Sequence, residues 1–266
     1  MNSIHAAALQ MISTPEVATN LATARRLIAQ AADAGAQLLA LPEYFAIMGA
    51  KDTDKLSVQE RFGDGPIQHM LAEAAREHGV WLVGGTVPLV SDDPSRVRNA
   101  SLVYNPQGEC VARYDKIHLF GFDNGSERFA EADTIQRGDT PVVVDTPFGR
   151  VGIAICYDLR FPELFRGHDV DIWVLPAAFT ATTGRAHWEV LLRARAIENQ
   201  CYVIAPGQGG LHPTGRATFG HSLIADPWGE VLALVAEGEG IAAAELKASQ
   251  IDRVRRILPA LQHRIL

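Results

Sequence analysis

The sequence predicts an α/β protein in which helices pack on mixed β-sheets. Short apolar runs, typical of buried strands, alternate along the chain with longer segments whose apolar residues recur at spacings of three and four, as on one face of a helix. Two turns, Thr146–Gly149 and Asp226–Gly229, are too short for a parallel crossover, so the strands that they join must be antiparallel. A purely parallel sheet therefore fits poorly, and the sequence holds no Gly-x-Gly-x-x-Gly or Walker pattern.

Proline and glycine mark the ends of the expected helices. Pro15 begins the first helix and Gly35 ends it, and Gly65-Pro66 begins the second, which ends at Gly79. The expected helices are residues 15–34, 66–78, 184–200 and 247–258, with a short one starting near 161–162. The expected strands, in order, are residues 5–11, 38–42, 80–90, 100–104, 142–145, 151–157, 172–176, 202–205, 222–225, 231–236 and 241–245.

Length and composition fit one globular domain. The chain has 266 residues, of which 47% are hydrophobic and 21% charged, so it can bury a large core and is not disordered as a whole. No internal repeat, low-complexity tract or proline-rich linker divides it. We therefore expect a single domain over residues 1–266.

Charge and cysteine content bear on partners and location. The formal net charge of −7 and the pI near 5.7 argue against nucleic acid or an anionic membrane as a partner, because both require a basic face. No apolar stretch approaches the roughly 20 residues that span a bilayer, and the N-terminus lacks the cationic segment of a secretory signal. The three cysteines are too few and odd in number for a disulfide framework. The expected location is therefore cytoplasmic.

Cys156 stands at the end of an apolar strand, before residues that look like a strand-to-helix turn. A thiol in this position faces backbone N–H groups and the positive end of a helix dipole, and both favour the reactive thiolate. Such a turn is typical of an exposed nucleophile. The alternative is a buried apolar thiol, which is the more common role of a single cysteine.

Glu43 and Lys116 are candidates for a base and a fixed cation. Glu43 ends a buried strand, where an unpaired carboxylate is costly and where a raised pKa suits a general base. Lys116 could hold a carbonyl oxygen as negative charge develops on it. Taken alone, Glu43 is better explained as a capping or ion-paired carboxylate, and Lys116 as a solvated surface lysine.

Three segments resemble the signature segments of the nitrilase superfamily of carbon–nitrogen hydrolases, in the same order and with fitting spacing. They are Leu41-Pro-Glu-Tyr-Phe, Tyr114-Asp-Lys-Ile-His-Leu-Phe and Gly152-Ile-Ala-Ile-Cys-Tyr-Asp-Leu-Arg-Phe-Pro-Glu. Further segments, starting at Ala178, Gly220 and Arg255, resemble the Nit-type amidase branch of that superfamily. The resemblance covers essentially the whole chain.

The resemblance implies a four-layer α-β-β-α sandwich, in which two mixed sheets lie face to face with helices outside. It also implies a homodimer or higher homo-oligomer that extends the sandwich across the interface. Cys156 is expected to attack an amide carbonyl, Glu43 to transfer protons, and Lys116 with the backbone N–H of Tyr157 to stabilise the oxyanion. Water then hydrolyses a thioester on Cys156, and neither a metal nor another cofactor is expected.

The family also has a second glutamate between the lysine and the cysteine. Glu131 fits this position best, and its expected role is to hold Lys116 and orient the substrate amide. Glu127 is a rival, because Gly121 stands where the family usually has aspartate and the loop is about one residue short. Either glutamate could instead be an exposed loop carboxylate.

Besides Tyr157, two residues are expected to bind the substrate. By the resemblance, Arg160 grips the substrate carboxylate, for which a guanidinium group is well suited. The alternative is an ion pair with Asp158 or Glu163. Thr183 is expected to line the same pocket, or else to cap the helix that follows it.

The implied substrate is a small molecule, the amide of a 2-oxo acid. The branch and the Gly207–His212 segment favour deaminated glutathione, which would be cleaved to 2-oxoglutarate and cysteinylglycine. The alternatives are an omega-amidase acting on 2-oxoglutaramate or 2-oxosuccinamate, another carbon–nitrogen hydrolase such as a carbamoylase, nitrilase or acyltransferase, and a catalytically silent scaffold.

Overall fold

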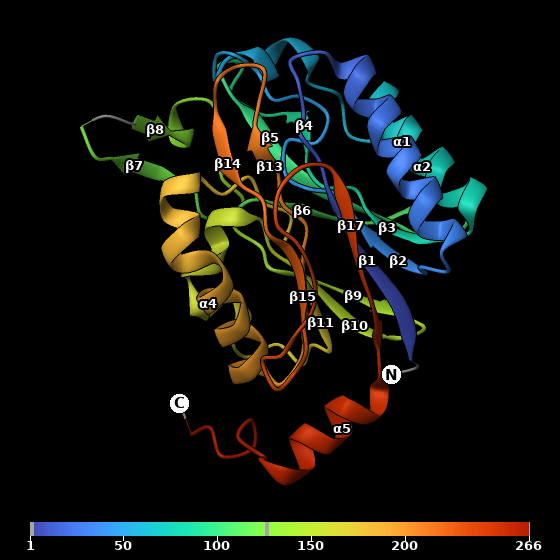
Figure 1. Ribbon diagram of the computed structural model, residues 1–266. Helices are drawn as coiled ribbons and strands as arrows, with labels where there is room; N and C mark the ends of the chain where they lie inside the picture. Colours follow the sequence, from blue (N-terminus) through green and yellow to red (C-terminus); the bar gives the residue numbers. More distant parts are fainter. Residues whose placement is uncertain (1–2, 126–127, 266) are drawn as a thin grey trace.

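The computed structural model describes residues 3–125 and 128–265, and these form two mixed β-sheets between layers of helix. In Figure 1, α1 (Val17–Asp33) and α2 (Pro66–His78) lie side by side on one outer face, and α4 (Ala181–Asn199) covers the opposite face. The short α3 (Pro162–Phe165) precedes α4 in the chain, and α5 (Ala248–Ile257) lies at one end of the molecule. The predicted four-layer α-β-β-α sandwich is therefore confirmed.

Both sheets combine parallel and antiparallel strands. In the described residues, the first sheet has the order β17 (Gly240–Leu246), β1 (Ile4–Gln10), β2 (Leu38–Ala40), β3 (Trp81–Val83), β5 (Val97–Tyr104) and β4 (Val87–Val90), with β6 (Cys110–Asp115) also paired to β5. The second has the order β16 (Val231–Val235), β15 (Ser222–Ala225), β12 (Tyr202–Ala205), β11 (Ile172–Val174), β10 (Gly149–Ile153) and β9 (Val142–Thr146). The pairs joined by the two predicted short turns, β9–β10 and β15–β16, are antiparallel as expected.

Small hairpins and 3-10 turns complete the described fold. The hairpins pair β7 (Gly121–Asp123) with β8 (Arg128–Ala130) and β13 (Gly209–Leu211) with β14 (Ala217–Phe219). The 3-10 turns are η1 (Asp54–Val58), η2 (Glu131–Asp133) and η3 (Cys156–Arg160).

The central strands of the first sheet are apolar on both faces because each face contributes to a different core. In β1, Ala6 and Ala8 belong to the core between the sheets, whereas Ala7 and Leu9 belong to the core beneath α1 and α2. This alternation follows the period of two of a strand. The site residues that follow these strands are therefore held by layers packed on both sides.

Three expected elements differ in the structure. The run 80–90 forms two strands, because the chain bends at Gly85, where φ is +56° and a Cβ would lie 2.3 Å from the Pro42 carbonyl oxygen. The strand predicted to reach residue 157 ends at Ile153, so Cys156 lies in η3. The helix expected to begin at Gly184 begins at Ala181, after Thr180 as N-cap. Strand β6 was not predicted, since it is an edge strand with partly exposed faces.

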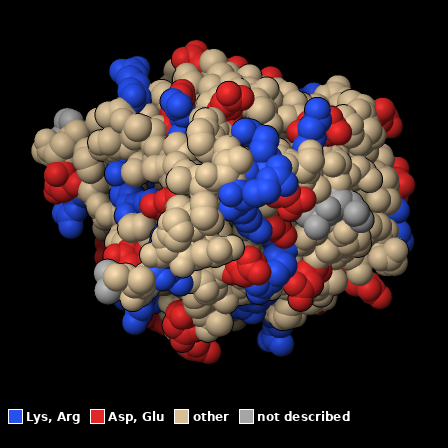
Figure 2. Space-filling model, turned by 90° about the horizontal axis from the view of Figure 1, so that it is seen from below, with Lys and Arg blue, Asp and Glu red and all other residues tan. Residues whose placement is uncertain are grey.

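Basic and acidic side chains are interspersed at the end of the molecule that carries α5. Figure 2 shows this end, where groups of Lys and Arg are bordered by Asp and Glu. One of the α5 arginines, Arg255, forms an ion pair of 3.2 Å with Asp171. Of the helices in the described residues, none is both long and apolar enough to cross a membrane.

Candidate active site

Glu43 lies three residues beyond the C-terminal end of β2, a buried central strand of the first sheet. Its side chain is 1% exposed and accepts three hydrogen bonds. Oε1 accepts from Lys116 Nζ at 2.8 Å and from Asn99 Nδ2 at 2.9 Å, and Oε2 accepts from the backbone N–H of Ala178 at 3.0 Å. These donors come from both sheets, so the carboxylate is fixed where the two sheets meet.

Lys116 follows β6 and bridges two carboxylates. Its side chain is fully buried, and Nζ donates to Glu43 Oε1 and to both oxygens of Glu131, at 2.9 and 2.8 Å. Burial by itself lowers the pKa of Lys116, but the charges of Glu131 and Glu43 outweigh it and raise the pKa above its ordinary value. The ammonium group is therefore a permanent cation between two acids.

Glu131, in η2, is the second glutamate of this cluster. Its Oε1 accepts from the Tyr44 hydroxyl at 2.8 Å and its Oε2 from the backbone N–H of Phe120 at 2.7 Å. Burial acts to raise the pKa of Glu131, but the charge of Lys116 prevails and lowers it. The rival Glu127 lies outside the described residues.

Cys156 begins η3 with the unusual backbone angle φ +48°, and its N–H donates to the Pro176 carbonyl at 2.9 Å. Such a left-handed conformation is strained for a residue other than glycine and is typical of functional turns. The N–H of Ala178, which donates to Glu43, belongs to a residue that lines the same pocket as Cys156. The predicted base and nucleophile therefore lie on either side of Ala178.

The surroundings of Cys156 favour the protonated thiol over the thiolate. Burial raises its pKa well above the ordinary value, and the charge of Glu43 raises it further, whereas Lys116 and the N–H of Ala178 lower it by less. The predicted contribution of a helix dipole is small, because Cys156 begins the short 3-10 turn η3 and α3, which follows it, has only four residues. A base would have to remove the thiol proton before the sulfur could act as a nucleophile, and the Glu43 carboxylate lies near enough for its charge to raise the pKa of the thiol.

Asp158 fixes η3 to the strand that carries Lys116. This fully buried carboxylate accepts from the Tyr114 hydroxyl at 2.7 Å, from the Ile155 N–H at 2.8 Å and from the His118 N–H at 3.0 Å, and it also contacts the His118 ring. Asp158 thus positions the turn that holds Cys156. The alternative in which it pairs with Arg160 is wrong.

Arg160 lies beside Cys156 in a small pocket together with Tyr157 and Thr183, and the rest of the lining consists of Phe120, Ala178, Phe179 and Thr180. Its guanidinium carbon lies 5.7 Å from the Tyr157 ring centre and 5.3 Å from that of Phe179. The ion pairs of the described residues include none to Arg160, so neither Asp158 nor Glu163 neutralises it.

Thr183 faces the pocket but does not cap α4. The N-cap is Thr180, whose side chain accepts from the N–H of Thr183 at 3.3 Å, and the two hydroxyl groups lie 2.9 Å apart. The pocket thus brings together a thiol, a guanidinium group and hydroxyl groups, a combination suited to a carboxylate-bearing acyl group.

Several supporting residues were missed in the sequence. Asn99 and Ala178 orient Glu43, and Gln208 donates to the Glu43 carbonyl at 3.1 Å and to the Ser13 hydroxyl at 2.7 Å. Gln208 belongs to the 207–212 segment, which was interpreted only as a substrate signal. These contacts depend on strand register across two sheets, for which the sequence carries no local signal.

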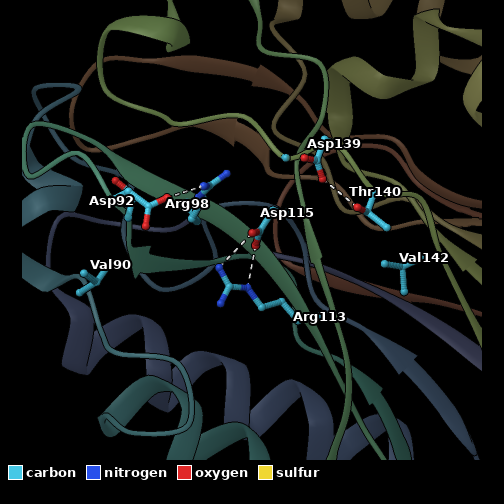
Figure 3. A pocket seen from close by; sticks show the side chains of 10 residues that line it. Val90, Asp92, Arg98, Arg113, Asp115, Asp139, Thr140 and Val142 are labelled. Carbon is cyan, nitrogen blue, oxygen red and sulfur yellow. Dashed lines mark hydrogen bonds and ion pairs between the residues drawn. The ribbon is translucent and has the colours of Figure 1, made fainter.

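A larger polar hollow, of about 510 Å³, lies away from these residues. Figure 3 shows that its two arginines point toward aspartates: Arg98 pairs with Asp92 at 3.1 Å, and Arg113 pairs with Asp115 at 2.8 Å. None of the predicted site residues lines it. Groups of three or more side chains able to hold a metal ion are also not found in the described part of the chain.

The chain is similar to known proteins over nearly its whole length. A model of the family described as carbon-nitrogen hydrolase matches residues 5–256. The chain is 40% identical to deaminated glutathione amidase of Yersinia enterocolitica over 99% of its own length and 93% of the relative's, and 40% identical to the human protein of that name over 97% and 81%.

The fold is also similar to those of solved structures from this family. The NitFhit protein of Caenorhabditis elegans has a TM-score of 0.92 and 36% identity, and the match covers 99% of this chain and 65% of that longer one. Nit3 of Saccharomyces cerevisiae, described as a member of branch 10 of the nitrilase superfamily, has a TM-score of 0.89 and 29% identity, covering 99% and 97%. By its sequence and its fold, this chain belongs to the carbon-nitrogen hydrolase family.

Proposed function

We propose that the chain hydrolyses the amide of a 2-oxo acid, with deaminated glutathione as the substrate and 2-oxoglutarate and cysteinylglycine as products. The observation that carries this proposal is the cluster in which Lys116 bridges Glu43 and Glu131, while the N–H of Ala178, a residue that lines the pocket of Cys156, donates to Glu43. The names of relatives at about 40% identity support the choice of substrate.

In the first half of the reaction, Glu43 takes the proton of the Cys156 thiol as the sulfur attacks the amide carbonyl. The new C–S bond converts the carbonyl oxygen into an oxyanion, which Lys116 and the N–H of Tyr157 stabilise. The C–N bond then breaks, and Glu43 gives its proton to the departing amine nitrogen. A thioester on Cys156 and a free amine result.

In the second half, Glu43 takes a proton from water as the water oxygen attacks the thioester carbonyl. The C–S bond breaks, the proton returns from Glu43 to the sulfur, and the carboxylic acid leaves. Glu131 is a positioning residue, because it holds Lys116 with both oxygens and is itself held by Tyr44 and Phe120. These side chains and one water molecule account for every bond made and broken.

Arg160 binds the carboxylate of the 2-oxo acid, with Thr183 beside it. The support is that its guanidinium group is partly buried in the Cys156 pocket, stacks near two aromatic rings and has no carboxylate partner among the described residues. A substrate carboxylate would supply the missing counter-charge through a charge-assisted hydrogen bond.

Replacing Arg160 with methionine is expected to lower kcat/KM for deaminated glutathione and for 2-oxoglutaramate by about 30-fold or more, because a charge pair worth about 2 kcal/mol or more is lost. Steady-state kinetics on both substrates measure this. Arg25→Met serves as a control, because Arg25 is an exposed residue of α1 that pairs with Glu73. Equal kinetics for Arg160→Met and the control would contradict the assignment.

The substrate is tested directly with wild-type protein. Release of 2-oxoglutarate from deaminated glutathione and from 2-oxoglutaramate separates the two amidase alternatives, and intact-protein mass after a rapid quench identifies the acyl group on Cys156. A higher kcat/KM for deaminated glutathione with a 2-oxoglutaryl adduct supports the proposal. Absence of turnover on both amides would exclude it.

Two broader features belong to this proposal. We infer that residues 1–266 act as one catalytic domain, in line with a family match over residues 5–256.

We also infer a cytoplasmic location, since the mechanism needs a reduced Cys156 and the three cysteines of the chain are free thiols. Cell fractionation with an antibody against the chain tests the location.

We further propose a homodimer formed through α4. Val190 and Ile197 are seven positions apart on one face of this helix and are 61% and 47% exposed. Trp228 is 46% exposed and lies on the β15–β16 turn, whose Gly229 would contact Ile197 if it carried a Cβ. A second copy of the chain would cover this apolar surface.

Replacing Val190 with aspartate is expected to convert the dimer into a monomer, because the charge would be buried without a partner at the interface. Sedimentation velocity measures the mass at micromolar concentration. Val90→Asp, at a valine that is 47% exposed and lines the polar hollow of Figure 3, is the control and should remain dimeric. A wild-type monomer, or a dimer in both variants, would contradict the proposal.

A further inference from the structure

Two basic side chains, Lys55 and Arg216, flank the ring of Tyr44, the residue that follows the proposed base. Lys55 Nζ lies 5.5 Å from the Tyr44 ring centre, and the guanidinium carbon of Arg216 lies 5.9 Å from it. The Tyr44 hydroxyl in turn donates to Glu131. The two cations are thus one side chain removed from the catalytic cluster, in a hollow also lined by Ile47, Met48 and Lys51.

Neither of these cations has a carboxylate partner. The ion pairs within the described ranges, 3–125 and 128–265, include none to Lys55 or Arg216, although Asp52 lines the same hollow. The Lys55 ammonium donates to the Thr134 hydroxyl at 3.1 Å, and Arg216 Nε is buried without a hydrogen-bond partner in the described structure. A buried donor without a partner is costly unless a ligand satisfies it.

The electrostatics point the same way. Burial lowers the pKa of Lys55, and the charge of Arg216 adds to that lowering, while Asp52 and Glu131 oppose it. Two like charges held around one ring repel each other. An anion bound in the hollow that both side chains line would relieve both the repulsion and the desolvation.

Two aromatic rings connect this hollow with the pocket of Cys156. The Arg216 guanidinium carbon lies 5.3 Å from the ring centre of Phe129, and the Phe129 ring lies 5.5 Å from that of Phe120, which lines the Cys156 pocket. Arg160 serves the acyl half of the substrate. The part of an amide that lies across the scissile bond from the acyl half is the leaving amine.

We propose that Lys55 and Arg216 bind a carboxylate at the far end of the leaving amine. The substrate class is therefore an amide that joins a 2-oxo acid to an amino acid or dipeptide with a free carboxylate, and this inference deepens and rests on the proposed function. In deaminated glutathione the leaving group is a dipeptide, whose carboxylate can reach roughly 7 Å from the scissile nitrogen in extended form. In 2-oxoglutaramate the leaving group is ammonia, which offers nothing for these cations to bind.

The test compares three substrates across matched variants. The substrates are deaminated glutathione, its C-terminal glycinamide analogue, which lacks only the terminal carboxylate, and 2-oxoglutaramate. Arg216→Met and Lys55→Met are each expected to raise KM for deaminated glutathione at least about tenfold, the loss of one charge-assisted hydrogen bond. Rates on the glycinamide analogue and on 2-oxoglutaramate should change less than about twofold.

Lys51→Met is the matched control, because Lys51 lines the same hollow but is exposed, so its removal changes the charge without removing a proposed contact. All variants are compared with wild type by thermal melting, so that a folding defect is recognised. If Arg216→Met raises KM equally for all three substrates, or for none of them, the inference is overturned while the proposed function stands.

A binding measurement separates this inference from the proposed function. Calorimetry with cysteinylglycine and cysteinylglycinamide on wild type should show at least about tenfold tighter binding of the carboxylate form, and Arg216→Met should abolish that difference. This result decides the carboxylate subsite even if wild type cleaves none of the three amides, an outcome that would exclude the proposed function. Equal affinity of wild type for both dipeptides would overturn the inference.

Discussion

Replacing Cys156 with alanine is expected to lower kcat for amide hydrolysis by at least about 10³-fold, since removal of a covalent nucleophile costs as much as about 10⁶-fold in other hydrolases. The protein should remain folded, because the side chain is small and the turn around it is held by Asp158 and by the Pro176 carbonyl. Release of 2-oxoglutarate under saturating substrate measures the loss. Intact-protein mass should show that the acyl adduct of the wild type is absent from the variant.

Cys110→Ser is the matched control for this experiment. Cys110 is an exposed thiol in β6, and burial of part of its surface raises its pKa, so it is a poor nucleophile outside the cluster. Full activity and an intact adduct are expected in this variant. An acyl group found on Cys110, or activity retained by Cys156→Ala, would remove Cys156 from the mechanism.

Replacing Lys116 with methionine is expected to reduce kcat by about 10²-fold or more through loss of oxyanion stabilisation. It should also destabilise the protein by about 3–5 kcal/mol at neutral pH, because Glu43 and Glu131 would remain buried without their shared cation. Urea unfolding and steady-state kinetics measure the two effects. A solvated surface lysine could be replaced without such a loss of stability, so this measurement tests that alternative for Lys116.

The stability difference between wild type and Lys116→Met should grow as pH rises from about 4 to 7. In the wild type the pKa of Glu131 is lowered, so its contribution is complete above its unfolded value of 4.5 and is lost as pH falls through the folded value. In the variant, burial without the cation raises that pKa, so the native state holds its proton more tightly and stability falls as pH rises.

Two further variants check this explanation. Lys51→Met removes an exposed lysine and should leave stability and its pH dependence unchanged. The double variant Lys116→Met with Glu131→Gln removes one of the facing charges, so it should recover part of the lost stability while staying inactive. A double variant no more stable than Lys116→Met would mean that lost packing, and not charge, causes the defect.

The sequence was sufficient for the layers of the fold and for the residues of the cluster. Strand and helix periodicity predicted the α/β class, and the short turns predicted the antiparallel pairs β9–β10 and β15–β16. Glu43, Lys116, Glu131 and Cys156 were singled out by their segments, and the structure brings them into one cluster. From burial and periodicity alone, each of these residues would have been interpreted as structural and not as catalytic.

The rest depends on long-range geometry. Asn99 reaches Glu43 because β5 lies beside β3, and Asp158 reaches Tyr114 because η3 faces the end of β6. Neither pairing follows from local sequence. The bend at Gly85 was missed for the same reason, since it is the approach of the Pro42 carbonyl that requires glycine there.

The inner cluster carries two carboxylates against one ammonium, so it has a surplus negative charge. An uncharged amide group meets no repulsion there, but the acid that hydrolysis forms becomes a carboxylate beside Glu43 when it loses its proton. At an effective dielectric constant near 20, two such charges at about 4 Å repel by about 4 kcal/mol. The lysine-bridged pair therefore lowers the affinity for the acid that it produces and promotes the exit of that acid from the cavity.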